Sequence, residues 1–473
     1  GQVAMYGRSY LGATQWLAAL AKPPSLRAIA PGVTASNYYE GWTYQGGAFQ
    51  LAFALAWAAY SLSLGNFGRL ARTLDDAAAQ RARLWQAVHD LPAAWRFAPL
   101  RAWPVLERLA PYYYEWLDHP AYDDYWRRTA IKEHYGRLDL PTFNYGGWFD
   151  VFAMGTVENF AGMRGQAPGH GRDSRLLMGP WSHTTLPQNY LGERHFGALG
   201  SADAIDLDGW QLRFFDYWLK GMDDGWSEEP PVRLFVMGAN TWRSEHEWPL
   251  ARTEWTRWYL HSGGRANTAE GDGVLSPEPP GPEPPDVFLY DPRDPVPTCG
   301  GAVHVSFPGV LPSGPLDQRA IERRSDVLVY TSAPLPAELE VTGPVEAVIW
   351  AITSAADTDF TAKLVDVFPD GRAVSVVDGI VRARYRDSLT EARPVPPGEP
   401  QRYVIRLGPT SVVFGKGHRI RLEISSSNFP RFDRNWNVFE PVAGLAAGRP
   451  AVQTVLHEPA YPSHVVLPVI PCA

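Results

Sequence analysis

A glycine-flanked serine near the start of the chain constrains the fold more strongly than any other feature of the sequence. Residues 3–6 are apolar and predict a short buried strand. Residues 13–20 have the composition and spacing of a helix. Ser9 lies between them in the sequence Gly-Arg-Ser-Tyr-Leu-Gly (residues 7–12). A sharp strand-to-helix turn of this kind can present a nucleophilic hydroxyl, although glycine-flanked serines also occur in ordinary turns.

The two segments before and after Ser9 are the first parts of a predicted α/β core. Further strands are predicted at 26–30, 140–145 and 174–178, and further helices at 151–163 and 204–222. Strands that alternate with helices at this spacing are typical of parallel βαβ units. We therefore assign residues 1–36 and 136–229 to an α/β-hydrolase core.

Two other regions interrupt or follow this core. Residues 37–135 contain no β-rich run and predict helices at 48–62, 70–91 and 121–134, so we interpret them as a helical cap inserted into the core. Residues 230–473 contain short alternating runs separated by Pro/Gly-rich connectors, which indicates an all-β sandwich or jelly roll. The predicted strands of this last domain are 232–236, 256–261, 327–331, 345–352, 360–368, 403–407 and 418–426.

Composition excludes several partners. The formal net charge is −8 and the basic residues are scattered, which argues against nucleic acid as a partner. No apolar run has the length of a membrane span, so we expect no membrane association. The chain has no CxxC or HExxH pattern, and we expect no metal and no cofactor. Cys299 and Cys472 could pair across the last domain or stay free, and we expect free thiols.

The chain begins within its first predicted strand. We therefore expect the N-terminal strands of the core to be missing from this chain, and a separate segment or chain to complete the sheet. The compartment cannot be read from the N-terminus. A soluble protein is expected, with the cytoplasm as the favoured location and self-association left open.

The order of three residue types along the chain fits a serine hydrolase. Asp150 follows the predicted strand 140–145, and His183 follows 174–178. In doubly wound hydrolases the order is Ser, Asp or Glu, then His, on loops at one edge of the sheet. Asp150 could instead cap the next helix, and His183 could be an ordinary surface histidine. Other histidines fit less well because they fall in the helical region, in a loop or in the β domain; these are His89, His134, His195, His304, His418 and His457.

Three motifs resemble those of the cocaine esterase-like (CocE/NonD) hydrolases. They are Gly-Arg-Ser-Tyr-Leu-Gly at 7–12, Gly-Gly-Trp-Phe-Asp at 146–150 and Gly-Pro-Trp-Ser-His at 179–183. This group belongs to the X-Pro dipeptidyl-peptidase (S15) superfamily, which also contains α-amino acid ester hydrolases. The resemblance continues into the last domain at 294–298 and 357–360. It implies an α/β-hydrolase core, a helical cap and a C-terminal jelly roll.

The resemblance also implies roles for single residues. Ser9 would be the nucleophile, Asp150 the orienting acid and His183 the base. The backbone N–H of Tyr10 would be one oxyanion donor. In these relatives the second donor is a tyrosine hydroxyl upstream of the serine, in a segment that this chain does not contain. Loss of one such donor lowers turnover on the order of 10²- to 10³-fold.

Aromatic residues at matching positions imply an apolar acyl pocket. Trp42, Trp57 and Phe152 stand where the cocaine esterase-like pattern has pocket residues, although Trp57 also fits a plain core position. The likeness to hydrolases that hold a free α-amine is weaker, since Glu40 is the only nearby acid. The expected function is cleavage of a small-molecule ester or amide with an apolar or aromatic acyl group. Two alternatives remain, an X-Pro dipeptidyl-peptidase-type aminopeptidase and a non-catalytic protein that binds through its β domain.

Overall fold

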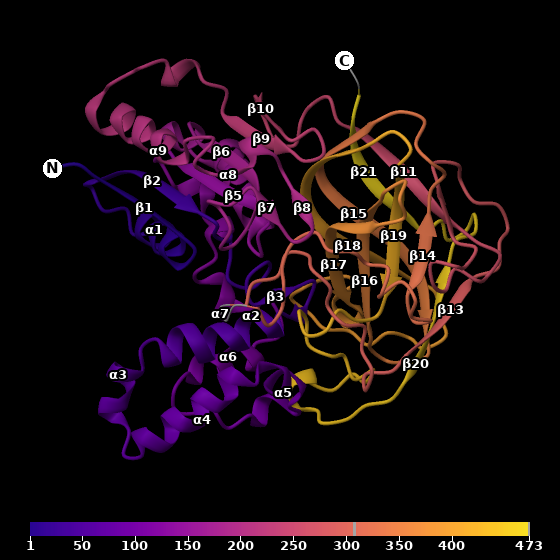
Figure 1. Ribbon diagram of the computed structural model, residues 1–473. Coiled ribbons are helices and arrows are strands. Elements are labelled where there is room, and N and C mark those ends of the chain that lie inside the picture. The colour runs from indigo at the N-terminus through magenta and orange to yellow at the C-terminus, as the bar shows by residue number, and fades with distance from the viewer. Residues whose placement is uncertain (306–308, 472–473) are drawn as a thin grey trace.

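The structure, a computed structural model, describes residues 1–305 and 309–471 and contains three parts. Figure 1 shows an α/β sheet with its helices, a helical region beneath it, and a β domain that packs against both. Cys472 lies outside the described residues, and Cys299 is a half-buried free thiol.

Parallel pairing organises the α/β part. Its six-stranded sheet has the order β1-β2-β5-β6-β9-β10, in which the first five strands are parallel and only β10 is antiparallel to its neighbour. Apolar side chains of α1 and α8 form one buried cluster with β2, whereas those of α9 pack with β5 and β6. Helices therefore cover both faces of the sheet, as parallel sheets require. The strands are β1 (Val3–Arg8), β2 (Leu26–Gly32), β5 (Phe143–Phe149), β6 (Arg175–Ser182), β9 (Val232–Val236) and β10 (Thr241–Glu245), and the helices are α1 (Tyr10–Leu20), α8 (Ala153–Gln166) and α9 (Leu207–Phe215).

The first strand differs from expectation in its exposure. The apolar run predicts a buried strand, but β1 lies at the edge of the described sheet and pairs only with β2 among the described strands. The side chains of Val3 and Tyr6 are 52% and 74% exposed. An apolar run predicts a strand but does not show whether that strand is central or at the edge of its sheet.

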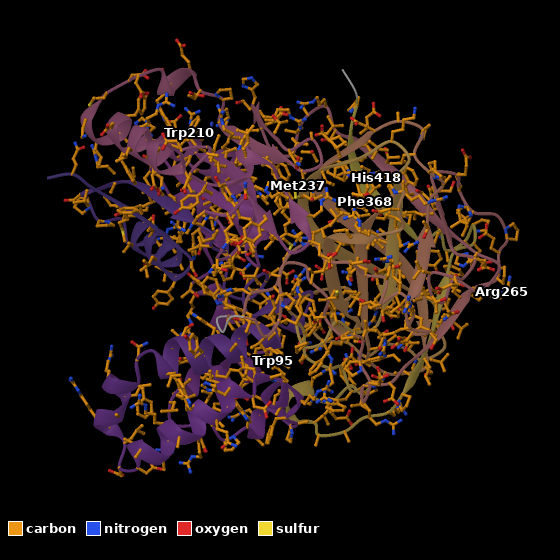
Figure 2. The ribbon with its side chains drawn as sticks, in the orientation of Figure 1. Trp95, Trp210, Met237, Arg265, Phe368 and His418 are labelled. Carbon is orange, nitrogen blue, oxygen red and sulfur yellow. The ribbon has the colours of Figure 1, made fainter. Side chains whose placement is uncertain are left out.

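The predicted start of the β domain at residue 230 is too early, because the hairpin of β9 and β10 belongs to the α/β sheet. β9 pairs in parallel with β6, and β10 pairs with β9, so the α/β sheet continues to Glu245. Short alternating strands look alike in either sheet, and only their pairing separates them. Met237, labelled in Figure 2, comes directly after β9. Its backbone bridges to that of Val412 in the β domain. The two sheets are therefore connected by backbone hydrogen bonds at this point.

The helical region lies between β2 and β5 in the sequence. It opens with a small hairpin, and the helices that follow bury aromatic and leucine side chains in one cluster. The helix predicted at 121–134 is wrong: the segment contains one short helix and single turns, because Trp126 packs into this cluster whereas Ile131 packs under α1. The elements are β3 (Tyr44–Gln45), β4 (Ala48–Phe49), α2 (Leu51–Ala56), a π-helix (Trp57–Leu64), α3 (Phe67–Leu70), α4 (Ala77–His89), α5 (Leu91–Arg96), α6 (Pro111–Asp118) and α7 (Asp124–Arg127).

The part of the chain that the structure describes was also tested for membrane spans. No single helix in it is both long and apolar enough to cross a membrane. Leu51–Leu64 and Phe67–Thr73 together have the length and composition of a membrane span, but the two helices are bent by 64° relative to each other.

The β domain is one 11-stranded sheet of mostly antiparallel strands, in which β18 pairs with β15 outside the main strand order. Two long strands, β15 and β18, pair over most of their length, and β16 lies between β17 and β19. Their inward side chains form a large apolar core. The strands are β11 (Glu254–His261), β12 (Val274–Ser276), β13 (Asp286–Tyr290), β14 (Leu328–Thr331), β15 (Leu339–Thr353), β16 (Asp359–Val367), β17 (Ala373–Arg382), β18 (Gln401–Phe414), β19 (Arg419–Ser425), β20 (Ala451–Leu456) and β21 (His464–Ile470).

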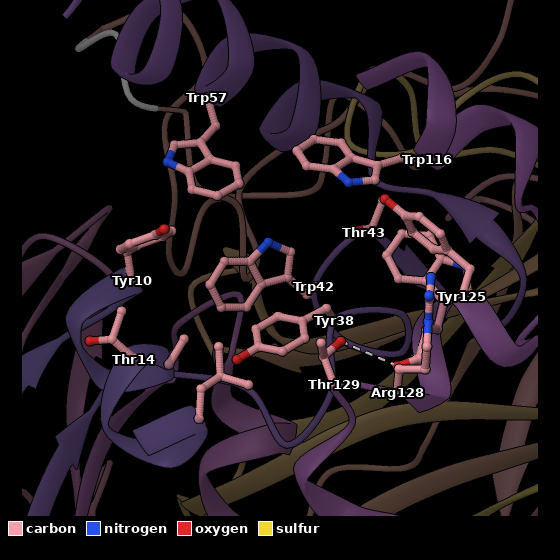
Figure 3. A pocket seen from close by; sticks show the side chains of 13 residues that line it. Tyr10, Thr14, Tyr38, Trp42, Thr43, Trp57, Trp116, Tyr125, Arg128 and Thr129 are labelled. Carbon is pink, nitrogen blue, oxygen red and sulfur yellow. Dashed lines mark hydrogen bonds between the residues drawn. The ribbon is translucent and has the colours of Figure 1, made fainter. Parts of the chain in front are cut away.

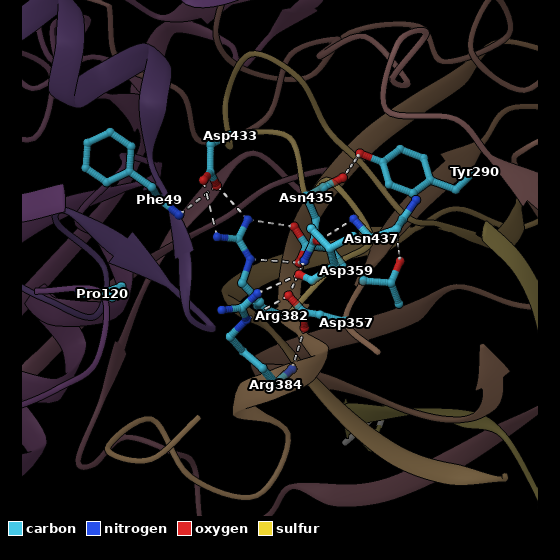
Figure 4. A network of polar contacts seen from close by, with 12 residues as sticks. Phe49, Pro120, Tyr290, Asp357, Asp359, Arg382, Arg384, Asp433, Asn435 and Asn437 are labelled. Atoms are coloured by element: carbon cyan, nitrogen blue, oxygen red, sulfur yellow. Dashed lines mark hydrogen bonds and ion pairs between the residues drawn. The ribbon is translucent and has the colours of Figure 1, made fainter. Parts of the chain in front are cut away.

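A buried charge network joins the helical region to the β domain (Figure 4). The guanidinium of Arg382 donates to both oxygens of Asp359, at 2.9 and 3.0 Å, and to both oxygens of Asp433, at 2.7 and 3.2 Å. Asp433 also accepts a hydrogen bond from the backbone N–H of Phe49 at 3.0 Å. Both ion pairs are nearly inaccessible to solvent. The hairpin that opens the helical region is thereby held against β17.

We predict that Arg382→Ala destabilises the protein by about 3 to 5 kcal/mol, since it leaves two buried carboxylates without their counter-ion. The matched control is Arg83→Ala, which removes one partner of the exposed Arg83–Asp76 pair and is expected to change stability by less than about 1 kcal/mol. Urea unfolding measures both. Equal effects of the two substitutions would contradict a supporting role for the network.

Candidate active site

Ser9 occupies a strained turn between β1 and α1. Its backbone has φ 60° and ψ −123°, a conformation that residues other than glycine rarely adopt. The backbone N–H of Ser9 donates to the carbonyl of Gly32 in β2 at 2.9 Å. This turn places the serine at the carboxyl end of a parallel strand, where α/β proteins form their sites.

The small residue Gly12 permits close packing around this turn. A Cβ atom added at Gly12 would lie 2.9 Å from the Cβ of Thr34 and 3.0 Å from the carbonyl oxygen of Gly32. The first turn of α1 can therefore lie against the end of β2 only because this position has no side chain.

Three predicted residues that are distant in sequence meet at this edge of the sheet. Nε2 of His183 lies 2.8 Å from Oγ of Ser9, and Nδ1 of His183 lies 3.2 Å from each carboxylate oxygen of Asp150. Asp150 follows β5 and His183 follows β6, and these two strands are neighbours. The pairing of β2 with β5 brings the serine to the same edge.

The protonation of His183 follows from its two partners. An ionised carboxylate only accepts hydrogen bonds, so Nδ1 carries the proton that faces Asp150. Nε2 is then the acceptor for the Ser9 hydroxyl. Asp150 is fully buried, and its Oδ1 also accepts from the backbone N–H of Phe152 at 2.7 Å. In this arrangement His183 can take a proton from Ser9.

Tyr10, whose backbone N–H is the expected oxyanion donor, follows Ser9 at the start of α1. Tyr10 is the first residue of α1, and the first N–H groups of a helix have no partner within the helix. The N-terminus of α1 carries the positive end of the helix dipole next to Ser9.

A cavity of about 350 Å³ lies beside the serine turn. Figure 3 shows Tyr10 at one end of it and Tyr125 and Arg128 at the other, with aromatic rings between them. Trp42 and Trp57, two predicted pocket residues, both line it. Most of the lining is apolar and comes from α1 and the helical region; its members are Tyr10, Ala13, Thr14, Leu17, Tyr38, Trp42, Thr43, Trp57, Trp116, Tyr125, Trp126, Arg128 and Thr129.

Phe152, the third predicted pocket residue, is fully buried next to the cavity and does not line it. Its ring stacks on Trp42 with a centroid distance of 4.3 Å and meets the ring of His183 edge-on at 5.2 Å. Phe152 therefore connects the cavity wall to the histidine.

Two further residues bear on the site. The sequence gives His304 no role in the site because it falls in the predicted β domain, but its ring centroid is 4.4 Å from that of His183. No local pattern in the sequence marks it, because the contact exists only once the two parts have packed together. Glu40 is buried, burial raises its pKa, and its oxygens accept from the backbone N–H of Gly46 at 3.1 and 3.3 Å.

Family models cover most of the chain. The model of the X-Pro dipeptidyl-peptidase (S15 family) matches residues 1–185, which include the serine, acid and histidine motifs. The model described as the X-Pro dipeptidyl-peptidase C-terminal non-catalytic domain matches residues 224–466.

Individual relatives agree with these matches. The chain is 40% identical to cocaine esterase of Rhodococcus sp. (strain MB1 Bresler), over 99% of this chain and 81% of the relative. An aminopeptidase from a marine sediment Thaumarchaeota archaeon has a similar structure, with a TM-score of 0.80, 26% identity, and coverage of 99% of this chain and 77% of that chain. An α-amino acid ester hydrolase gives a TM-score of 0.78 at 25% identity, over 99% and 76% of the two chains.

We predict that Gly147→Ala destabilises the protein by about 1 to 3 kcal/mol through overpacking. The added Cβ would lie 2.2 Å from the backbone oxygen of Trp181, so β5 and β6 would have to separate just before Asp150 and His183. Gly165→Ala is the control, because nothing lies within 4 Å of its added Cβ. Chemical denaturation compares the two variants, and equal stability would contradict this account of the strand contact.

Proposed function

We propose a substrate class and catalytic roles for this chain, which belongs to the X-Pro dipeptidyl-peptidase (S15) family and is a serine hydrolase of the cocaine esterase-like type. The observation that carries the proposal is the continuous contact from Ser9 through His183 to Asp150. We assign Ser9 as the nucleophile, His183 as the general base and Asp150 as the acid that orients the base.

The proposed reaction proceeds through an acyl-enzyme. Oγ of Ser9 attacks the ester carbonyl and gives its proton to Nε2 of His183, while Asp150 stabilises the positive imidazole. Collapse of the tetrahedral intermediate breaks the ester bond, and the leaving alcohol takes the proton from Nε2. Water, activated by the same nitrogen, then hydrolyses the Ser9 ester and releases the acid. The N–H of Tyr10 donates to the developing oxyanion.

We further propose that the free edge of β1 pairs with a strand from an upstream segment or a separate chain. The exposure of Val3 and Tyr6 along this edge supports that pairing. By the family resemblance, such a segment would also bring the second oxyanion donor, a tyrosine hydroxyl.

The proposed substrate is an ester or amide with an apolar or aromatic acyl group. The aromatic cavity next to Tyr10 supports this choice, because apolar lining with few polar groups favours apolar ligands. Trp42 and Trp57 would contact the acyl group, and Phe152 would support Trp42 from behind. A relative at 40% identity is named for esterase activity on cocaine, which agrees with this class.

An aminopeptidase of the X-Pro dipeptidyl type is the second candidate. It is favoured by the S15 family match and by the structural likeness to an archaeal aminopeptidase. An enzyme of this kind must hold a free α-amine. Glu40, the nearby acid, is instead buried on the N–H of Gly46, and Val151 and Phe152 follow Asp150. Glu40 and the two residues after Asp150 therefore offer no free carboxylate for an α-amine, which supports the esterase proposal.

We predict that a fluorophosphonate probe labels the wild-type chain and that Ser9→Ala abolishes labelling, because only an activated serine reacts. Asp150→Asn is expected to slow labelling and turnover on the order of 10⁴-fold, since the base loses its orienting partner. Ser201→Ala, outside the site, is the control. The measurement is intact mass after labelling. No labelling of the wild type in the presence of the upstream segment would favour a binding protein instead.

We also predict that an aryl benzoate ester is cleaved faster than an X-Pro amide reporter. The physical reason is that the cavity offers aromatic surface and Glu40 is already engaged. The comparison of kcat/KM for the two reporters on one preparation measures this preference. A faster rate on the X-Pro amide would establish the peptidase alternative.

A further inference from the structure

His304 belongs to the β domain but lies against the histidine of the active site. The two ring centroids are 4.4 Å apart with an interplanar angle of 47°. Residue 304 falls within the segment that matches a C-terminal domain described as non-catalytic. A side chain of that domain therefore contacts the residue to which we assign the role of general base.

The rings around His183 leave it little room to rotate. Phe152 meets it edge-on at 5.2 Å, and His304 lies against it at a tilt. His304 is itself held by Phe53 of α2, whose ring centroid is 5.7 Å away. The imidazole that must reach both Asp150 and Ser9 is thus packed by the α/β part and the β domain together.

The charge state of His304 matters because His183 becomes positive during the reaction. Burial, and then the neighbouring His183, lower the pKa of His304 to about 3. The charge that acts on it is that of His183, with Asp150 behind that ring, and Phe53, which packs against His304, carries no charge. His304 is therefore neutral at physiological pH and does not oppose a positive charge on His183.

We propose that His304 is a positioning residue for His183: its ring holds the imidazole in the orientation that contacts both Ser9 and Asp150. This inference rests on the proposed function. It assigns a part in the reaction to the β domain without giving that domain a group that touches the reacting atoms.

Three substitutions test the inference in the full chain. His304→Ala removes the ring and is expected to lower kcat on the order of tenfold to a hundredfold, with little change in KM, because the base loses its orientation. His304→Phe restores a neutral ring and should recover most of kcat. His304→Arg introduces a permanent charge, which should move the acid limb of the kcat/KM profile to lower pH by about one unit or more.

His418→Ala is the matched control. His418, labelled in Figure 2, is a part-buried histidine of the same domain and lies outside the proposed site. It pairs with Asp366 at 2.7 Å. Its substitution should leave kcat and the pH profile unchanged. Thermal unfolding of every variant reports whether a loss of rate follows from a loss of fold.

The outcomes separate the inference from the proposed function. Wild-type kcat and pH profile in His304→Ala would overturn the inference, and so would equal losses in His304→Ala and His304→Phe. If His304→Ala does not fold, an unshifted acid limb in His304→Arg overturns it. An unlabelled wild-type serine would contradict both proposals, whereas a labelled serine with unaffected His304 variants contradicts this one alone.

Discussion

The strained backbone at Ser9 is the constraint on which the site depends. A positive φ at a residue with a side chain is unfavourable, and it persists only where surrounding contacts hold it. Here the Ser9 N–H bonds to Gly32 on the neighbouring strand, and Gly12 lets α1 approach the same strand end. The strain is therefore held by β2, whose end also positions β5 and with it Asp150. Strand pairing thus connects the serine to its partners.

A second Ser–His–Asp cluster in the β domain shows that residue types alone do not make such a site. The Ser262 hydroxyl donates to Asp286 at 2.7 Å and lies 3.1 Å from Nε2 of His457. The same Nε2 also contacts Asp286, at 2.9 Å. Asp286 therefore holds the hydroxyl itself, and the carboxylate on the far side of the imidazole is that of Glu283, 3.2 Å from Nδ1 of His457. All three residues are buried, so a substrate cannot reach them, and we interpret the cluster as a structural network.

The sequence predicted the meeting of Ser9, Asp150 and His183 because parallel strands end at one edge, and this rule needs only the strand positions. The pairing of β9 and β10 with the α/β sheet could not be predicted in the same way, because the sequence of a short alternating strand does not show which sheet it joins. The irregular segment after Asp123 was also missed. Its apolar side chains, Trp126 and Ile131, pack into two different cores, and an amphipathic pattern in one segment does not reveal that split.

The contact of His304 with His183 could not be predicted from the sequence either, because it depends on how the β domain packs against the α/β part. Local propensity has no bearing on it. Buried ion pairs are specific in geometry, and the Arg382 network fixes the helical region on β17, while Met237 fixes the α/β sheet on β18. Both contacts hold the β domain, to which His304 belongs, against the parts of the chain that carry Ser9 and His183. Through the proposed role of His304, the β domain would influence the site by packing against His183, without a group that touches the reacting atoms.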